Sequence, residues 1–152
     1  IGSSCIYQGE ELGLSDVTNI QFDKMKDPWG LNFYPEFLGR DTCRTPMVWE
    51  KNKPMGGFTS ANESWLPISK SHLEKAGLDM VKSEGSIYNK FSSFLKWRKQ
   101  QPAMMTANNM SSITGGPKEI IFDRISKTQI LRCKFDFELV KATFEEVTHG
   151  TG

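Results

Sequence analysis

The sequence predicts a chain of mixed α/β class, with strands towards its two ends and its main helix between them. Three observations support this: a short apolar run from Ser3 to Gln8, an amphipathic segment from Ser86 to Gln100, and a hairpin pattern from Glu119 to Phe137. The first is typical of a buried strand, the second of a helix, and the third of paired strands with one face in solvent. The predicted order is therefore strand, long loop, helix, boundary and hairpin.

The run from Ser3 to Gln8 has the continuous apolar centre of a parallel strand that is buried on both faces. The alternative is the first turn of a helix that continues through residues 10–12. Gly9 and Gly13 disfavour that alternative, because glycine is a poor helix former.

The segment from Gly13 to Ala61 holds most of the prolines and has little sustained periodicity. A loop of this length is unusual in a compact domain unless it is functional or disordered. Its many aromatic residues argue against disorder. We therefore expect a functional loop that folds against other parts of the protein, with short helical turns near Ile20 to Met25.

The helix from Ser86 to Gln100 carries one apolar stripe, with Ser86 as a suitable N-cap and Pro102 as a stop. Trp97 lies near that stripe, and we expect it to pack rather than to bind a ligand. The stripe consists of Ile87, Phe91, Phe94 and Leu95.

Two strands are predicted after the helix, at Glu119 to Arg124 and at Leu131 to Phe137, joined by a polar turn. The second alternates strictly between apolar and polar residues, as a half-buried strand does. Residues 104–116, rich in Asn, Ser, Thr and Gly, read as a domain boundary. From Glu138 to Gly152 the alternation is lost, so the tail from residue 141 to 152 is of unclear status and is given no function.

The composition excludes several classes of partner. A net charge of +1 with evenly spread charges leaves no basic surface for nucleic acid or a membrane, and we expect a small, neutral partner. The cysteines Cys5, Cys43 and Cys133 share no metal-ligand spacing, so we expect free, buried thiols in a reducing cytoplasm, with a disulfide as the alternative. We predict no cofactor and no metal site.

The most informative stretch runs from Gly39 to Trp49 and contains Arg40, Asp41 and Arg44. The planar guanidinium groups suit bidentate contacts to carboxylates, phosphates or vicinal hydroxyls, and Asp41 could hold one of the arginines in place. Phe37 and other nearby aromatic residues could form apolar walls. The alternative is a surface ion pair on a well-anchored loop.

This stretch resembles the loop after the eighth strand in the α-glucosidase and oligo-1,6-glucosidase branch of glycoside hydrolase family 13. Further motifs of that family follow in its order: Tyr7 to Gly13, Asp27 to Gly30 with Tyr34 to Phe37, Gly56 to Thr59 with Trp65 to Pro67, and Phe94 to Ala103. The resemblance implies the C-terminal part of a (β/α)8 TIM barrel in residues 1–103, a boundary at 104–116, and the start of an antiparallel β-domain in residues 117–140. A chain of 152 residues is too short for a whole barrel of ~250 residues, so we expect a fragment whose partner is the N-terminal part of the barrel.

The family's reaction retains configuration and uses an Asp nucleophile with a Glu acid/base. By the resemblance, these carboxylates lie upstream of Ile1, so we predict no catalytic residue here and expect Glu10 and Glu11 to orient loop backbone instead. Arg40 matches the arginine that binds the terminal glucose, and Phe37 matches a position at the pocket rim. Asp41 and Arg44 resemble their supporting residues.

The resemblance implies a retaining α-glucosidase that acts on short oligosaccharides or disaccharides, with this segment inactive when isolated. Two alternatives stay open. One is the same fold in a sucrose or trehalose isomerase or a transglucosidase, and the other is a non-catalytic relative similar to a transporter heavy chain.

Overall fold

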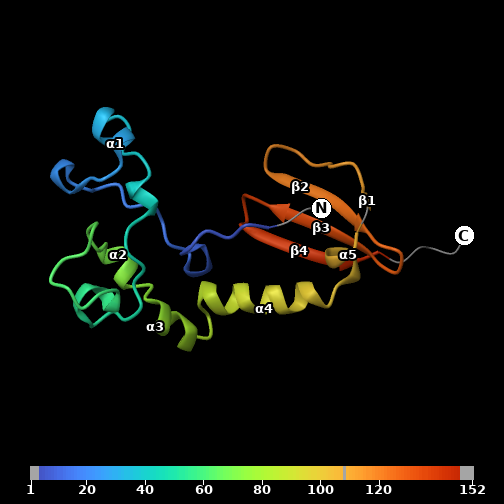
Figure 1. The fold of residues 1–152 in the computed structure, drawn as a ribbon. Helices are drawn as coiled ribbons and strands as arrows, with labels where there is room; N and C mark the ends of the chain where they lie inside the picture. The colour runs from blue at the N-terminus through green and yellow to red at the C-terminus, as the bar shows by residue number, and fades with distance from the viewer. Residues whose placement is uncertain (1–3, 108, 148–152) are drawn as a thin grey trace, which may run out of the picture. The chain divides into compact units, whose positions relative to one another are not determined.

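The computed structural model of the protein describes residues 4–107 and 109–147. Within these residues, contacts group Cys5–Ser92 into one unit, and Ser4 with the residues from Ser93 onwards into another. Short helical elements dominate the first unit, whereas a β-sheet dominates the second (Figure 1).

The first unit consists mostly of irregular chain that is interrupted by short helical elements. Its core is formed by Val17, Ile20, Met25 and Leu66, with Leu38 packed against them. The helical turn predicted near Ile20 to Met25 is confirmed as η2. Its elements are η1 (Glu10–Leu12), η2 (Phe22–Lys24), α1 (Pro28–Asn32), η3 (Asp41–Cys43), η4 (Pro54–Gly57), α2 (Lys70–Leu73) and α3 (Gly77–Lys82).

The predicted strand from Ser3 to Gln8 is wrong for the part that the structure describes. Residues 4–8 have no regular structure, and the side chains of Ile6 and Tyr7 are about half exposed. A parallel strand needs a hydrogen-bonded neighbour, and no strand of the described residues pairs with this segment. The local backbone is instead satisfied by side chains: Glu10 accepts the N–H of Tyr7 at 3.1 Å, and Glu11 accepts that of Gly9 at 2.8 Å.

The predicted helix is confirmed as α4 (Ile87–Lys99). Ser86 precedes it, and its hydroxyl oxygen accepts the N–H of Asn89 at 3.1 Å, as an N-cap does. In the C-terminal half of α4, Trp97 packs as expected, with its ring centre 5.0 Å from that of Phe144. The next helix, α5 (Pro102–Met105), contributes Ala103 and Met104 to the core of the second unit.

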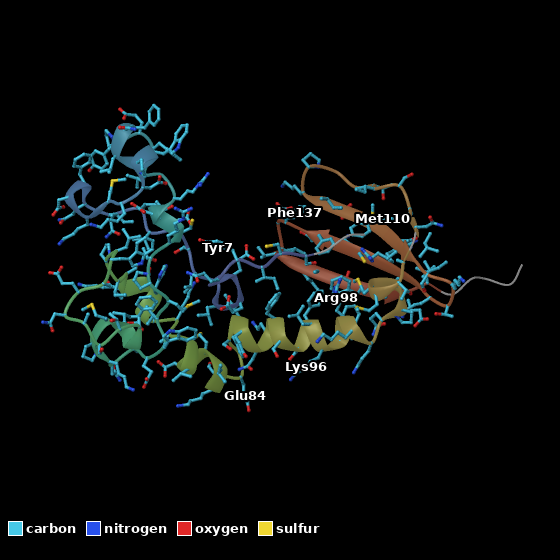
Figure 2. All side chains as sticks on the ribbon, viewed as in Figure 1. Tyr7, Glu84, Lys96, Arg98, Met110 and Phe137 are labelled. Atoms are coloured by element: carbon cyan, nitrogen blue, oxygen red, sulfur yellow. The ribbon has the colours of Figure 1, made fainter. Side chains whose placement is uncertain are left out.

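The second unit contains a four-stranded antiparallel sheet in the order β1-β2-β3-β4 (Figure 1). The predicted hairpin is confirmed as β2 (Glu119–Ile125) and β3 (Ile130–Asp136), with Phe122 opposite Cys133. β1 (Asn109–Met110) lies in the segment expected to be a boundary. Phe137, labelled in Figure 2, follows β3. Its side chain is 58% exposed. The domain limits derived from the sequence stay a prediction.

The sheet continues after Phe137 although the alternation is lost there, because residues 141–146 form a strand. β4 (Lys141–Glu146) pairs with β3, placing Phe144 opposite Cys133. The sequence pattern is weak because Phe144 is the only large apolar residue of this strand, which lies at the sheet edge. Residues 148–152 of the tail lie outside the described residues.

Cys133 is buried in this sheet, as expected, whereas the expectation of burial is wrong for Cys5 and Cys43, which are free and exposed. Burial in the apolar core raises the pKa of the Cys133 thiol. Across residues 4–107 and 109–147, no helix combines the length and apolar character needed to span a membrane.

Candidate functional site

The loop that carries the predicted site residues is anchored by the buried carboxylate of Asp41. This side chain is only 1% exposed. Its Oδ2 accepts the backbone N–H of Lys26 at 2.5 Å and that of Asp27 at 2.8 Å. The start of η3 is therefore fixed to a segment about fifteen residues earlier in the chain. Hydrogen bonds to a carboxylate are stronger than those between neutral groups, so this is a firm attachment.

A second carboxylate, that of Asp27, connects the same two segments in the opposite direction, by binding the backbone of Arg40. Its Oδ2 accepts the backbone N–H of Arg40 at 2.6 Å, and its Oδ1 accepts that of Trp29 at 3.2 Å. The second contact caps α1, where Pro28 occupies the first helical position. The hydrogen bond from Arg40 is the main reason that the pKa of Asp27 lies below its ordinary value of 3.8. Burial opposes this shift, while the N–H of Trp29 and the charges of Arg44 and Arg40 support it.

Two glycines allow the connected segments to approach this closely. Gly39 has a left-handed conformation with φ of +66°, and a Cβ there would lie 2.7 Å from Oδ2 of Asp27. A Cβ on Gly30 would lie 2.5 Å from the carbonyl oxygen of Leu38. Neither position accepts a larger residue without movement of the backbone or of the Asp27 carboxylate.

The anchored loop presents exposed groups. Arg40 is exposed although its backbone is fixed, and Phe37 is 50% exposed. Aromatic side chains project from the ribbon around α1 (Figure 2), and the rings of Trp29 and Phe33 stack with centres 5.7 Å apart. Exposed guanidinium donors and exposed aromatic faces are both suited to neutral, hydroxyl-rich ligands.

The structure brings the four predicted site residues, Phe37, Arg40, Asp41 and Arg44, into one loop, but it changes the expected contact of Asp41. Within residues 4–107, Oδ2 of Asp41 accepts two backbone N–H groups, and Asp41 makes no hydrogen bond to an arginine side chain. Its influence on Arg40 therefore passes through the backbone. Sequence reasoning missed Asp27, although an Asp-Pro pair before a helix is a recognisable N-cap signal.

A further anchor holds the end of this loop. His72 is buried, its Nε2 donates to the carbonyl oxygen of Ser15 at 2.8 Å, and its Nδ1 lies 3.5 Å from the hydroxyl of Thr45. These groups border a cavity of about 290 Å³. The predicted site residues do not line that cavity, and Tyr7, Glu10, Asp16, Thr42 and Cys43 are among those that do.

The two buried acids, Asp27 and Asp41, are already committed to structure, because each accepts backbone N–H groups. Among the described residues, no group of three or more His, Cys, Asp or Glu side chains is placed to hold a metal ion. The loop can therefore recognise and orient a ligand through Arg40 and the aromatic faces, and Asp27 and Asp41 are not free for acid–base chemistry.

Comparison with known proteins identifies the protein family to which this chain belongs. Residues 1–107 match the family described as alpha amylase, catalytic domain, and the chain belongs to this family. The resemblance to its α-glucosidase and oligo-1,6-glucosidase branch is confirmed by the relatives. Over 103 residues the chain is 47% identical to a probable alpha-glucosidase of Rhizobium meliloti (strain 1021), covering 68% of this chain and 18% of that protein. In an alignment 160 positions long it is 27% identical to an oligo-1,6-glucosidase of Halalkalibacterium halodurans, covering 90% of this chain and 28% of that protein.

Solved structures agree with this assignment. An alpha-glucosyl transfer enzyme superposes with a TM-score of 0.82 and 37% identity, covering 88% of this chain and 24% of the other. Isomaltulose synthase from Klebsiella superposes with a TM-score of 0.74 over 87% of this chain and 26% of the other, at 20% identity, which supports the fold alone. The predicted fold class, a C-terminal segment of a (β/α)8 barrel with the start of an antiparallel β-domain, is confirmed. The chain spans between 18% and 28% of the length of these relatives and structures.

Proposed function

We propose that the protein to which this chain belongs is a retaining α-glucosidase that releases terminal α-linked glucose from short oligosaccharides or disaccharides. The observation that carries the proposal is the anchored loop: the backbone of Arg40 is held by Asp27 while the residue itself is exposed. Phe37, three residues earlier in the chain, is half exposed. The names of the relatives support the choice of substrate class.

In this proposal Arg40 donates hydrogen bonds to hydroxyl groups of the terminal glucose, and Phe37 forms an apolar rim near the leaving group. A preformed arginine loses little conformational freedom on binding, which favours affinity for a neutral sugar. Asp41 and Arg44 keep the loop in shape. The carboxylates that form and hydrolyse the covalent intermediate belong to the upstream part of the barrel.

Glucosyl transfer is a second candidate, and the structural similarity to an alpha-glucosyl transfer enzyme at 37% identity favours it. Hydrolysis and transfer share the covalent intermediate and differ in whether water or a second sugar accepts the glucose. Chromatography of the products formed from maltose by the full-length protein separates them: glucose alone indicates hydrolysis, whereas new oligosaccharides indicate transfer. Absence of any turnover would favour the non-catalytic alternative.

The role of Arg40 is tested by Arg40→Lys in the full-length protein. Lysine keeps the charge but replaces the planar fork by one hydrated ammonium group. Loss of a charge-assisted contact of about 1.5–3 kcal/mol lowers kcat/KM by about 10- to 150-fold if the contact is present in the transition state. Arg98→Lys, on α4, is the matched control and should stay near wild type. A folded Arg40→Lys protein with wild-type kcat/KM would refute the assignment.

A further inference from the structure

We propose that Asp27 is a positioning residue for Arg40: it holds the backbone of that arginine so that the side chain meets the sugar in one orientation. This inference rests on the proposed function, because it takes Arg40 to be the residue that contacts the substrate. Asp27 belongs to the first unit, thirteen residues before Arg40, and sequence reasoning gave it no role.

The contacts of Asp27 are those of an anchor and not of a ligand-binding group. The residue is 8% exposed, and both carboxylate oxygens are engaged, Oδ2 by Arg40 and Oδ1 by Trp29. The N–H of Asp27 is itself held by Asp41, the residue that follows Arg40. The two carboxylates thus fasten the segments around Asp27 and Arg40 to each other in both directions.

Arg40 is held on its other side as well, since its carbonyl oxygen accepts the N–H of Cys43 at 3.3 Å in η3. The contact from Asp27 is the attachment that reaches Arg40 from outside its own turn. Gly39 makes this possible, because a side chain there would collide with Oδ2 of Asp27. Loss of the carboxylate leaves the N–H of Arg40 without its acceptor, and the turn that aims the side chain is free to rotate.

A positioning role and a purely structural role predict different results in a double-mutant cycle. If Asp27 acts through Arg40, its replacement matters only while the guanidinium group is present. If it merely stabilises the loop, the two losses of activity multiply, because they are independent.

The experiment compares Asp27→Asn, Arg40→Ala and the double variant in the full-length protein, measuring kcat and KM with maltose. Asn keeps the shape and removes the charge and one acceptor. We expect Asp27→Asn alone to lower kcat/KM by about 10-fold, and to lower it less than about 2-fold further once Arg40→Ala is present. Asp23→Asn, an exposed acid four residues earlier, is the matched control and should behave as wild type.

The inference is overturned if the loss of kcat/KM in the double variant equals the product of the two single losses. Wild-type kcat/KM in Asp27→Asn overturns it as well. If Asp27→Asn does not fold, Gly39→Ala disturbs the same contact while leaving the carboxylate in place, and unchanged kcat/KM in that variant overturns it equally. The proposed function is tested separately by Arg40→Ala. Full activity in that variant would show that Arg40 does not contact the substrate. Impaired Arg40→Ala with normal Asp27→Asn removes only the role of Asp27.

Discussion

Replacing Asp41 by asparagine in the full-length protein should loosen the anchored loop without changing its shape. The Oδ2 of Asp41 is the acceptor for two backbone N–H groups, at 2.5 Å from Lys26 and 2.8 Å from Asp27. Asparagine retains a carbonyl oxygen that can take the same position, but it carries no charge. The substitution therefore isolates the contribution of the charge to the two hydrogen bonds.

The expected magnitude follows from those two contacts. A hydrogen bond to a charged group contributes about 1.5–3 kcal/mol and one between neutral groups about 0.5–1.5, so each contact loses about 1 kcal/mol. Two contacts give about 2 kcal/mol, and since 1.4 kcal/mol corresponds to tenfold, local opening becomes about 30-fold more frequent. The near-complete burial of Asp41 leaves little opportunity for water to compensate.

Amide hydrogen exchange of the full-length protein measures this opening directly. The amides of Lys26 and Asp27 should exchange about 30-fold faster in Asp41→Asn, as derived above from the lost charge on two contacts. Asp79→Asn, at an exposed position in α3, should leave them unchanged. Unaltered exchange at both amides in Asp41→Asn would show that the carboxylate does not anchor the loop and that its hydrogen bonds are weaker than their lengths indicate.

Two further predictions concern the 152-residue chain by itself. The isolated chain should release no chromophore from a chromogenic α-glucoside above a boiled control, because an arginine-bearing wall cannot form the covalent intermediate; activity that disappears when a carboxylate within the chain is mutated would contradict this. The isolated chain should also show no sharp cooperative transition when heated and followed by near-ultraviolet circular dichroism, since large apolar side chains such as Ile6, Tyr7 and Trp65 are about half exposed. A soluble monomer with a sharp transition would mean that the chain is a self-sufficient domain.

The sequence was sufficient to predict those helices and strands that are stabilised within one short segment or by the next segment along the chain. α4 was recognisable because its N-cap, apolar stripe and stop lie within one short segment. The β2–β3 hairpin was recognisable because the strict alternation of β3 matches a half-buried strand. β4 was not recognisable from the sequence, because it forms a strand by pairing with β3. Its own sequence offers one large apolar residue, Phe144, and therefore no alternating pattern.

The candidate site also has features that the sequence predicts and features that only the structure reveals. The sequence by itself determined the family, through a run of motifs in order, and it determined that Phe37, Arg40, Asp41 and Arg44 lie in one loop. Only the tertiary structure decided what the acids do, because Asp27 and Asp41 bond to backbone groups thirteen to fifteen residues away. It also decided that residues 4–8 form no strand in this chain, since a parallel strand exists only where neighbouring backbone supplies its hydrogen bonds. Single hydrogen bonds from a side chain to a distant backbone group do not recur at a fixed spacing, and for that reason they leave no periodic pattern in the sequence.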